Sequence, residues 1–277
     1  MYKKETFTAV ILFFILQICF AQSSFQNLEL GKNSLNYKGN PLKATDRKSL
    51  AFSDKGAWFG FGFLEQSEMQ GGFSGPFLMT EQNGVWLSSS FISLHLTDKN
   101  EQELIDWKTA LVNQNSYNSH LEQEFQNEKL EVKQQLVFSS GHSAIQKTSI
   151  TNRSSKTITL YPIYNSKTYL DNMQLSTEGQ FLKLVSSKSN AVGYIQFFNE
   201  GIDIVITKDS FTAKANKLTL KPNETKEIVV SQTYIFPQYD WKKENENLAK
   251  IQFNTVLKDT KKEKENQLAQ LIAKKKS

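Results

Sequence analysis

Apolar and polar residues alternate along several short runs of this chain, and this pattern constrains the fold more than any other feature. Between residues 130 and 138, Leu130, Val132, Leu136 and Phe138 lie at even spacing, with charged and amide side chains between them. A period of two places these apolar side chains on one face of a β-strand, so the run is typical of a strand with one buried face. Similar apolar spacing recurs at 158–160, 202–206, 218–220 and 228–236.

Turn-forming residues separate these runs. Asn152, Arg153 and two serines lie between two of them, and Pro222, Asn223 and Glu224 lie between two others. Many short strands bounded by turns predict an all-β fold, a large antiparallel β-sandwich whose two sheets pack between about residues 25 and 236. The side chains expected to be largely buried are Leu130, Val132, Leu136, Phe138, Ile202, Ile204 and Ile206.

Two segments carry helical signals. Residues 98–111 hold Leu104, Ile105 and Trp107 among acids and lysines, which fits a helix and equally fits a strand followed by a loop. Residues 240–276 have no Pro or Gly and repeat apolar residues at helical intervals. We therefore expect one or two helices in a linker-like segment, 239–277, with Asp259 and Thr260 as a break between them.

The N-terminus has the pattern of a secretory signal peptide. Lys3 and Lys4 precede a mostly apolar stretch at 7–20, and Ala21 follows it. The apolar stretch is short for a membrane span. We expect cleavage after residue 21, a mature β-sandwich domain at 22–238, a periplasmic or secreted location, and no membrane association after cleavage. Since Cys19 is the only cysteine, the mature chain is expected to have no disulfide bond.

The sequence carries no strong signature of catalysis or of metal binding. The formal net charge is +5 and most basic residues are scattered among acids, so no nucleic-acid partner is expected. The three histidines, His95, His120 and His142, are far apart in the sequence, which disfavours a zinc site. The fragment 141–145, GHSAI, lacks the second glycine and the following helix of a nucleophile elbow, so we interpret it as a hairpin turn that leads into a strand. We assign no catalytic residue, no metal and no cofactor.

One segment, residues 56–80, is unusual because it combines glycines with aromatic rings. Glycine allows close backbone approach, and rings provide flat apolar area, so the combination suits a surface that meets a sugar or another domain. The alternative is two core strands joined by a glycine turn. The candidates for domain-interface or sugar contacts are Trp58, Phe59, Gly71, Gly72, Phe73, Gly75 and Pro76.

This segment also carries a resemblance to a known family. The stretches 54–60, 69–76 and 78–81, which read DKGAWFG, MQGGFSGP and LMTE, resemble the N-terminal domain of bacterial glucosidases of glycoside hydrolase family 63. A weaker likeness, in strand pattern, extends from about residue 35 to residue 236. The resemblance implies a large β-sandwich, linker helices after it, and a separate catalytic (α/α)6 barrel that holds both catalytic carboxylates. No residue of this chain matches those catalytic positions.

The resemblance implies a non-catalytic domain that acts in oligosaccharide metabolism as the partner, or the remnant, of such a barrel. The barrel could be separately encoded. The alternatives are a stand-alone carbohydrate-binding module, with exposed rings among Trp58, Trp86, Trp107 and Phe73, and an interaction protein with no role in sugar metabolism. With no barrel present, we expect one of two arrangements for the glycine–aromatic face. The C-terminal helices cover it through Leu248, Ile251, Leu268 and Leu271, or it meets another chain.

Overall fold

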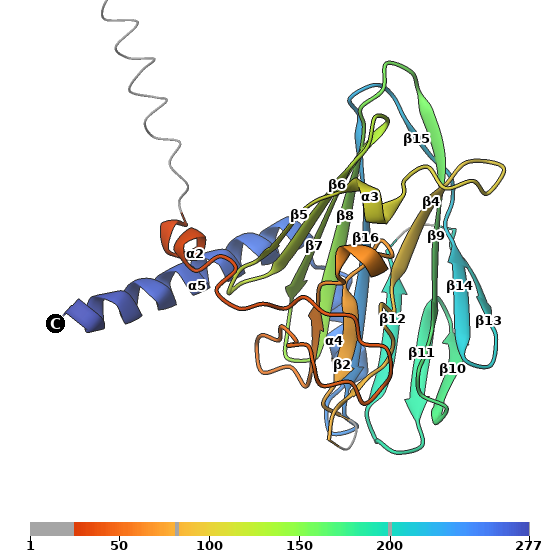
Figure 1. Ribbon diagram of the computed structural model, residues 1–277. Coiled ribbons are helices and arrows are strands. Elements are labelled where there is room, and N and C mark those ends of the chain that lie inside the picture. Colours follow the sequence, from red (N-terminus) through yellow and green to blue (C-terminus); the bar gives the residue numbers. More distant parts are fainter. Residues whose placement is uncertain (1–24, 81–82, 199–200, 277) are drawn as a thin grey trace, which may run out of the picture.

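The structure is a computed structural model that describes residues 25–80, 83–198 and 201–276. Strands make up most of the body; one short helix lies at the N-terminal end of the described chain, and the two longest helices lie at its C-terminal end (Figure 1). The strands are β1 (Phe59–Gly62), β2 (Ser74–Leu78), β3 (Val85–Trp86), β4 (Ser93–Thr97), β5 (Leu111–Ser116), β6 (Leu121–Gln126), β7 (Leu130–Phe138), β8 (Ser143–Asn152), β9 (Ile158–Lys167), β10 (Met173–Glu178), β11 (Phe181–Ser186), β12 (Val192–Phe197), β13 (Asp203–Ile206), β14 (Ser210–Lys214), β15 (Leu218–Leu220) and β16 (Thr225–Ile235). The helices are α2 (Gln26–Leu30), the 3-10 turn η1 (Gln66–Glu68), α3 (Trp107–Ala110), α4 (Trp241–Leu248) and α5 (Phe253–Lys276).

The largest sheet has eight strands in the order β10-β11-β12-β16-β8-β7-β6-β5, and all of its pairings are antiparallel. Along its central strands, inward and outward side chains alternate as the sequence pattern predicts. Leu130, Val132 and Leu136 of β7 are at most 1% exposed. These side chains point to the inner face, where they meet the second sheet, and their burial supplies the main driving force for folding.

The second sheet runs β13-β14-β9-β15, and β4 also pairs with β9. A small third sheet, β1-β2-β3, belongs to the glycine–aromatic segment. Phe59 of β1 packs against Phe138 of β7 and Tyr234 of β16, with ring centroids 5.2 and 4.9 Å apart. The small sheet therefore contributes to the same core as the two large ones.

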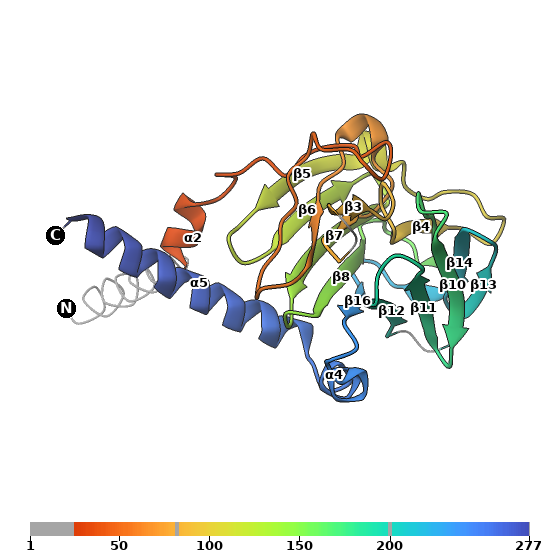
Figure 2. The same ribbon diagram turned by 90° about the horizontal axis from the view of Figure 1, so that it is seen from below.

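Helices α4 and α5 cover the opposite, outer face of the large sheet, below β7, β8 and β16 in Figure 2. Val137 and Ile145 of the sheet form an apolar cluster with Leu248 of α4 and with Phe253 and Leu257 of α5. Asp240 caps α4, because its carboxylate accepts hydrogen bonds from the backbone N–H groups of Lys242 and Lys243. Beyond this cluster, α5 extends away from the body and packs against α2 (Figure 1).

The predicted β-sandwich is confirmed, and so are the turns near 152–155 and 222–224. The hairpin turn predicted from residue 141 lies at 139–142, and β8 begins at Ser143. One part of the burial prediction is only half correct. Ile202, Ile204 and Ile206 pack against the core but stay partly exposed, because β13 is the edge strand of the second sheet and has a neighbour on one side only.

The helical expectations need two corrections. Residues 98–111 are mostly loop, with the single short turn α3 and the start of β5 at Leu111. The break in the C-terminal segment lies between Leu248 and Phe253, because the chain bends there to place both side chains in the outer apolar cluster. Asp259 and Thr260 lie inside α5, and Thr260 is 2% exposed, so this small side chain belongs to the helix face that packs on the body. The expected signal peptide, 1–21, lies outside the described residues.

Candidate functional site

Most rings and glycines of the glycine–aromatic segment are buried, and Trp58 is its exposed ring. Phe59 and Phe73 are 0% and 3% exposed, whereas the Trp58 side chain is 59% exposed. Gly71, Gly72, Gly75 and Pro76 are also buried. The exposure that we expected of Phe59 and Phe73 is therefore wrong, because both rings fill space between the sheets.

Gly71 and Gly72 are held by a ladder of buried amide side chains, here called the glutamine ladder: Gln114, Gln123 and Gln134. Gln123 donates to the carbonyl oxygen of Gly72 at 3.0 Å, and Gln134 donates to that of Gly71 at 2.8 Å. The ladder is continuous, because Gln114 Nε2 lies 3.4 Å from Gln123 Oε1 and Gln123 Nε2 lies 2.7 Å from Gln134 Oε1. Buried backbone carbonyls thus receive hydrogen bonds without any charge being buried.

The close approach requires glycine at both positions. A Cβ atom on Gly71 would lie 2.3 Å from the carbonyl oxygen of Leu94 and 2.5 Å from the ring of Trp107, and the φ angle there is +68°. A Cβ on Gly72 would lie 2.4 Å from the carbonyl oxygen of Ile92. Neither contact is sterically possible without movement. The segment therefore fits between the inner face of the large sheet and the start of the second sheet.

The rings proposed for sugar stacking are mostly unavailable. Trp86, Trp107 and Phe73 are at most 5% exposed, so only Trp58 of that set presents its ring to solvent. The helices do not cover the glycine–aromatic segment as expected either. Leu248 and Ile251 pack on the outer face of the large sheet, and Leu271 is 64% exposed.

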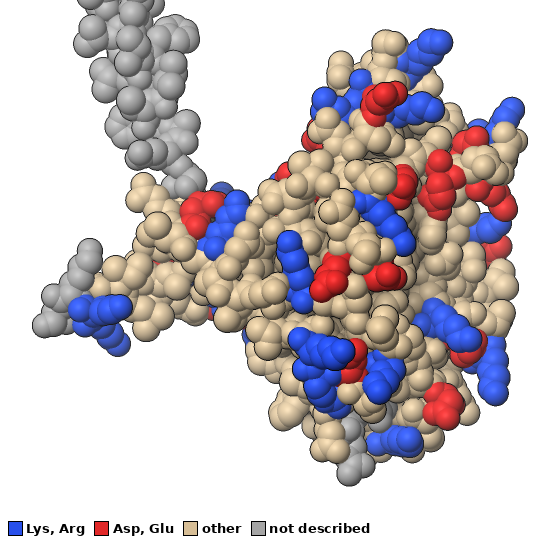
Figure 3. Space-filling view, in the orientation of Figure 1, with Lys and Arg blue, Asp and Glu red and all other residues tan. Residues whose placement is uncertain are grey.

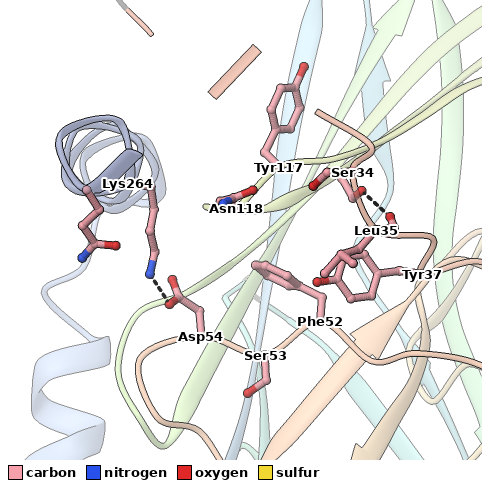
Figure 4. A pocket seen from close by; sticks show the side chains of 11 residues that line it. Ser34, Leu35, Tyr37, Phe52, Ser53, Asp54, Tyr117, Asn118 and Lys264 are labelled. Atoms are coloured by element: carbon pink, nitrogen blue, oxygen red, sulfur yellow. Dashed lines mark hydrogen bonds and ion pairs between the residues drawn. The ribbon is translucent and has the colours of Figure 1, made fainter. Parts of the chain in front are cut away.

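A pocket of about 270 Å³ opens beside the first residues of the segment (Figure 4). The N-terminal stretch, the Phe52–Asp54 stretch, the turn after β5 and helix α5 meet there. It is lined by Ser34, Leu35, Tyr37, Phe52, Ser53, Asp54, Ser116, Tyr117, Asn118, Lys264 and Gln267. Hydroxyl, amide and phenol groups dominate this lining, so the pocket is suited to a small polar group.

One carboxylate lines this pocket, and it is already paired. Lys264 Nζ donates to Asp54 Oδ1 at 2.6 Å, as Figure 4 shows, and the Asp54 side chain is 9% exposed. The second oxygen, Oδ2, accepts no hydrogen bond from the described residues. Burial raises the pKa of the Tyr37 phenol, which therefore stays neutral. An ion-paired carboxylate without a second carboxylate cannot perform the acid and base steps of glycoside hydrolysis.

A cluster of titratable side chains lies beneath the middle of α5. Its members are His120, Glu122, Lys133 and Lys261. Glu122 Oε1 lies 2.9 Å from Lys133 Nζ, and Gln135 donates to Oε2 at 2.7 Å. Burial alone would raise the pKa of Glu122, but His120 nearby and the bonds from Lys133 and Gln135 outweigh it and lower the pKa to about 2. Burial lowers the pKa of His120, so its neutral ring stacks on Tyr117 at a centroid distance of 4.6 Å.

The fragment 141–145 has a structural role. Ser143 is fully buried, and its hydroxyl donates to Glu244 of α4 at 2.6 Å and lies 2.7 Å from the Thr233 hydroxyl. Ser140 donates to the same Glu244 oxygen. The hairpin turn thus anchors α4, which agrees with the turn interpretation.

Within the described ranges, no helix is long and apolar enough to cross a membrane. The same residues contain no cluster of three or more histidine, cysteine or acidic side chains that could hold a metal ion. Sequence reasoning did not find the glutamine ladder or the Asp54–Lys264 pair. The one available signal for the ladder was Gln134, which interrupts the apolar alternation of β7 at an inward position.

Comparison with known proteins places these features in a family. The family model described as Glucosidase YgjK, N-terminal, matches residues 39–195, more than half of the 277-residue chain. Among solved structures, a protein from the human microbiome assigned as a kojibiose phosphorylase is similar, with a TM-score of 0.52 and 11% identity over 75% of this chain and 34% of that one. The chain therefore spans about a third of that protein.

A protein from Escherichia coli K12 assigned as an aldose 1-epimerase also matches, with a TM-score of 0.46 and 8% identity over 65% of this chain and 97% of that one. At 11% identity, the structure of the protein assigned as a kojibiose phosphorylase supports the sandwich fold alone. No curated protein matches the chain.

Proposed function

Because the chain belongs to the family of glucosidase YgjK N-terminal domains, we propose that it is the non-catalytic β-sandwich domain of a glucosidase of the family 63 type. In this proposal an (α/α)6 barrel, in the same or a separately encoded polypeptide, carries the catalytic carboxylates. The sandwich supports that barrel in oligosaccharide metabolism. The protein is exported to the periplasm or beyond by its signal peptide.

The observation that carries the proposal is the family match, which includes the whole glycine–aromatic segment. That segment is built into the core by the glutamine ladder, so its unusual composition serves the fold. The pocket beside it has one carboxylate, Asp54, which is neutralised by Lys264. Inverting glycosidases need two carboxyl groups roughly 6.5–9.5 Å apart with a water between them.

The test is a hydrolysis assay on the purified protein. Incubation with kojibiose, nigerose and maltose should release no glucose above a blank, and Asp54→Asn should behave as the wild type does. Turnover that survives repurification and is lost in Asp54→Asn, or in another single carboxylate variant, would contradict the proposal. Intact-mass analysis of exported protein tests the location: residues 1–21 should be missing.

A further inference from the structure

A groove crosses the outer face of the second sheet, on strands β4, β9 and β14. Two adjoining hollows of about 580 and 460 Å³ form it, and both are lined by Gln70 and Asn165. Volumes of this size are typical of small-molecule sites. The groove lies apart from the pocket in Figure 4, with which it shares no lining residue.

The sheet register builds the floor of the smaller hollow. Ser93, Asn165 and Thr212 are direct partners across β4, β9 and β14, so their side chains form one row. The neighbouring residues Leu94 and Tyr164 are at most 1% exposed and point into the core. By strand alternation, the row of hydroxyl and amide groups therefore faces away from the core, into the groove.

More hydroxyl groups form the wall. Ser88 Oγ lies 3.0 Å from Ser166 Oγ, and Ser166 donates to the carbonyl oxygen of Ser90 at 3.0 Å. These bonds fix the positions of the hydroxyl oxygens while leaving each oxygen able to accept another hydrogen bond. Gln70, in the glycine–aromatic segment, lines both hollows, and its amide oxygen accepts a hydrogen bond from Ser93 Oγ at 3.5 Å.

The larger hollow combines a compensated charge pair with an apolar wall. His95 Nδ1 lies 2.5 Å from Glu103 Oε1, and His95 Nε2 lies 3.1 Å from Asn165 Oδ1. If the ring donates both bonds, the Asn165 NH2 group is left for a ligand. Met69 and Ile105, which are 3% and 1% exposed, line the bottom of this hollow. The wall also contains Trp107, whose buried indole N–H donates to no acceptor among the described residues.

The charges of the groove are balanced. His95 faces Glu103, Lys167 pairs with Asp209 at 3.0 Å, and Asp106 and Lys108 contribute opposite charges from the same short helix. Figure 3 shows the same mixture over the visible face of the body, where basic and acidic side chains lie close together. A phosphate or carboxylate ligand would need an uncompensated cation, so the lining favours a neutral ligand.

We propose that this groove binds a short neutral oligosaccharide without cleaving it. Sugar hydroxyls both donate and accept hydrogen bonds, and amides and fixed hydroxyls match them, while apolar walls accept the C–H faces of the sugar ring. The choice of a glucose-containing oligosaccharide rests on the proposed function above. The expectation of a neutral, hydroxyl-rich ligand rests on the groove's own side chains and is independent of the proposed function.

The test is calorimetric titration of the purified protein with kojibiose, nigerose and maltotriose. Saturable binding is expected for at least one of them. Gln70→Ala should weaken it about tenfold or more, because Gln70 lines both hollows. Trp58→Ala, the matched control on the exposed ring, should leave it unchanged, and melting curves should show that both variants are folded.

Two results would overturn the inference: no saturable binding of any of the three sugars, or binding that is lost in Trp58→Ala and kept in Gln70→Ala. If Gln70→Ala fails to fold, Thr212→Val replaces it and must produce the same weakening. The glucose assay on the same samples separates the two proposals. Binding without glucose release supports both. Release contradicts the proposed function and the absence of cleavage, but not binding at the groove, and absence of binding contradicts only the groove.

Discussion

Strands β6 and β7 carry buried polar residues on both of their faces, and the two sets behave differently. On the inner face, Gln123 and Gln134 are fully buried and bind the carbonyls of the glycine–aromatic segment. On the outer face, Glu122 and Gln135 are the adjacent cross-strand pair, and Glu122 meets Lys133 beneath α5. The inner set is neutral and is bonded to backbone carbonyls and within itself, whereas the outer set contains charges and is bonded to side chains.

The difference reflects the surroundings of the two faces of the sheet. The inner face must satisfy backbone carbonyls deep in the core, and neutral amides do this without the large desolvation cost of a charge. Around Glu122 and Lys133 the outer face lies beneath α5 and keeps partial access to water, so an ion pair is tolerated there. Stability contributed by the inner face should be insensitive to pH, while that of the outer face should depend on it.

The largest expected effect is on the inner face, from Gly71→Ala. The added methyl group meets the backbone at Leu94 and the Trp107 ring, at a positive φ angle. We expect a loss of at least about 3 kcal/mol of unfolding free energy, or no folded protein. Urea denaturation measures it. The control is Gly179→Ala, with φ +61° and no atom within 4 Å of the new Cβ, which should cost about 1 kcal/mol. Equal losses in both variants would contradict the close-packing account.

The next effect is on the outer face, from Glu122→Gln. The folded-state pKa of Glu122, about 2, lies below its ordinary value of 4.5, so the folded state binds fewer protons there. Its contribution is present above about pH 5 and is lost as the pH falls toward 2. The variant should lose on the order of 2–3 kcal/mol at pH 7, and its stability should converge with that of the wild type in acid.

Urea denaturation at several pH values checks this convergence. Glu131→Gln is the control. Glu131 of β7 lies on the same face of the sheet as Glu122 of β6 and pairs with Arg153 at 2.7 Å, but it remains 46% exposed. It should cost less than about 1 kcal/mol at every pH. A pH-independent loss in Glu122→Gln would show that the carboxylate charge is not what stabilises this face.

A smaller loss is expected from Gln123→Leu, which removes donors to Gly72 and to Gln134 while keeping the volume similar. Leaving a buried carbonyl unpaired costs about 1–3 kcal/mol, and the loss should be the same at pH 4 and pH 7. Gln126→Leu, at the exposed end of β6, should change stability by less than about 0.5 kcal/mol. A stabilising Gln123→Leu would mean that the ladder is dispensable.

The sequence predicts the strands well and the polar interior poorly, for a physical reason. Alternation identifies which residues of β7 face inward, because burial of apolar side chains follows the strand period. The glutamine ladder breaks that rule at Gln134, whose partner Gly71 is 63 residues away along the chain. No local pattern encodes such a pairing. For the same reason, glycine-rich composition left a surface and two core strands open as alternatives, and the structure has the tightly packed interior.

The surface features, Trp58 and the groove, could be predicted only in part. Trp58 and Phe59 were both candidate contact residues, but Trp58 is exposed and Phe59 is buried. Strand alternation separates the two, because adjacent residues at the start of β1 point to opposite sides. The groove on the outer face of β4, β9 and β14 depends on strand register between distant segments, which composition does not reveal.

The smallest expected effect is from Trp58→Ala. The ring is mostly exposed, so its truncation should change the melting temperature by no more than about 2 °C. Differential scanning calorimetry measures it. A large destabilisation would show that the ring packs as core and would remove Trp58 as a surface candidate.

The most direct test of the distinction between the two faces is a pair of double-mutant cycles measured by urea denaturation. Gln123→Leu combined with Gln134→Leu probes two members of the ladder. Gln123→Leu combined with Glu122→Gln probes neighbours in sequence on opposite faces. The account predicts a coupling free energy of about 1 kcal/mol or more in the first cycle and additivity within about 0.5 kcal/mol in the second. Additive ladder variants, or strong coupling across the sheet, would contradict it.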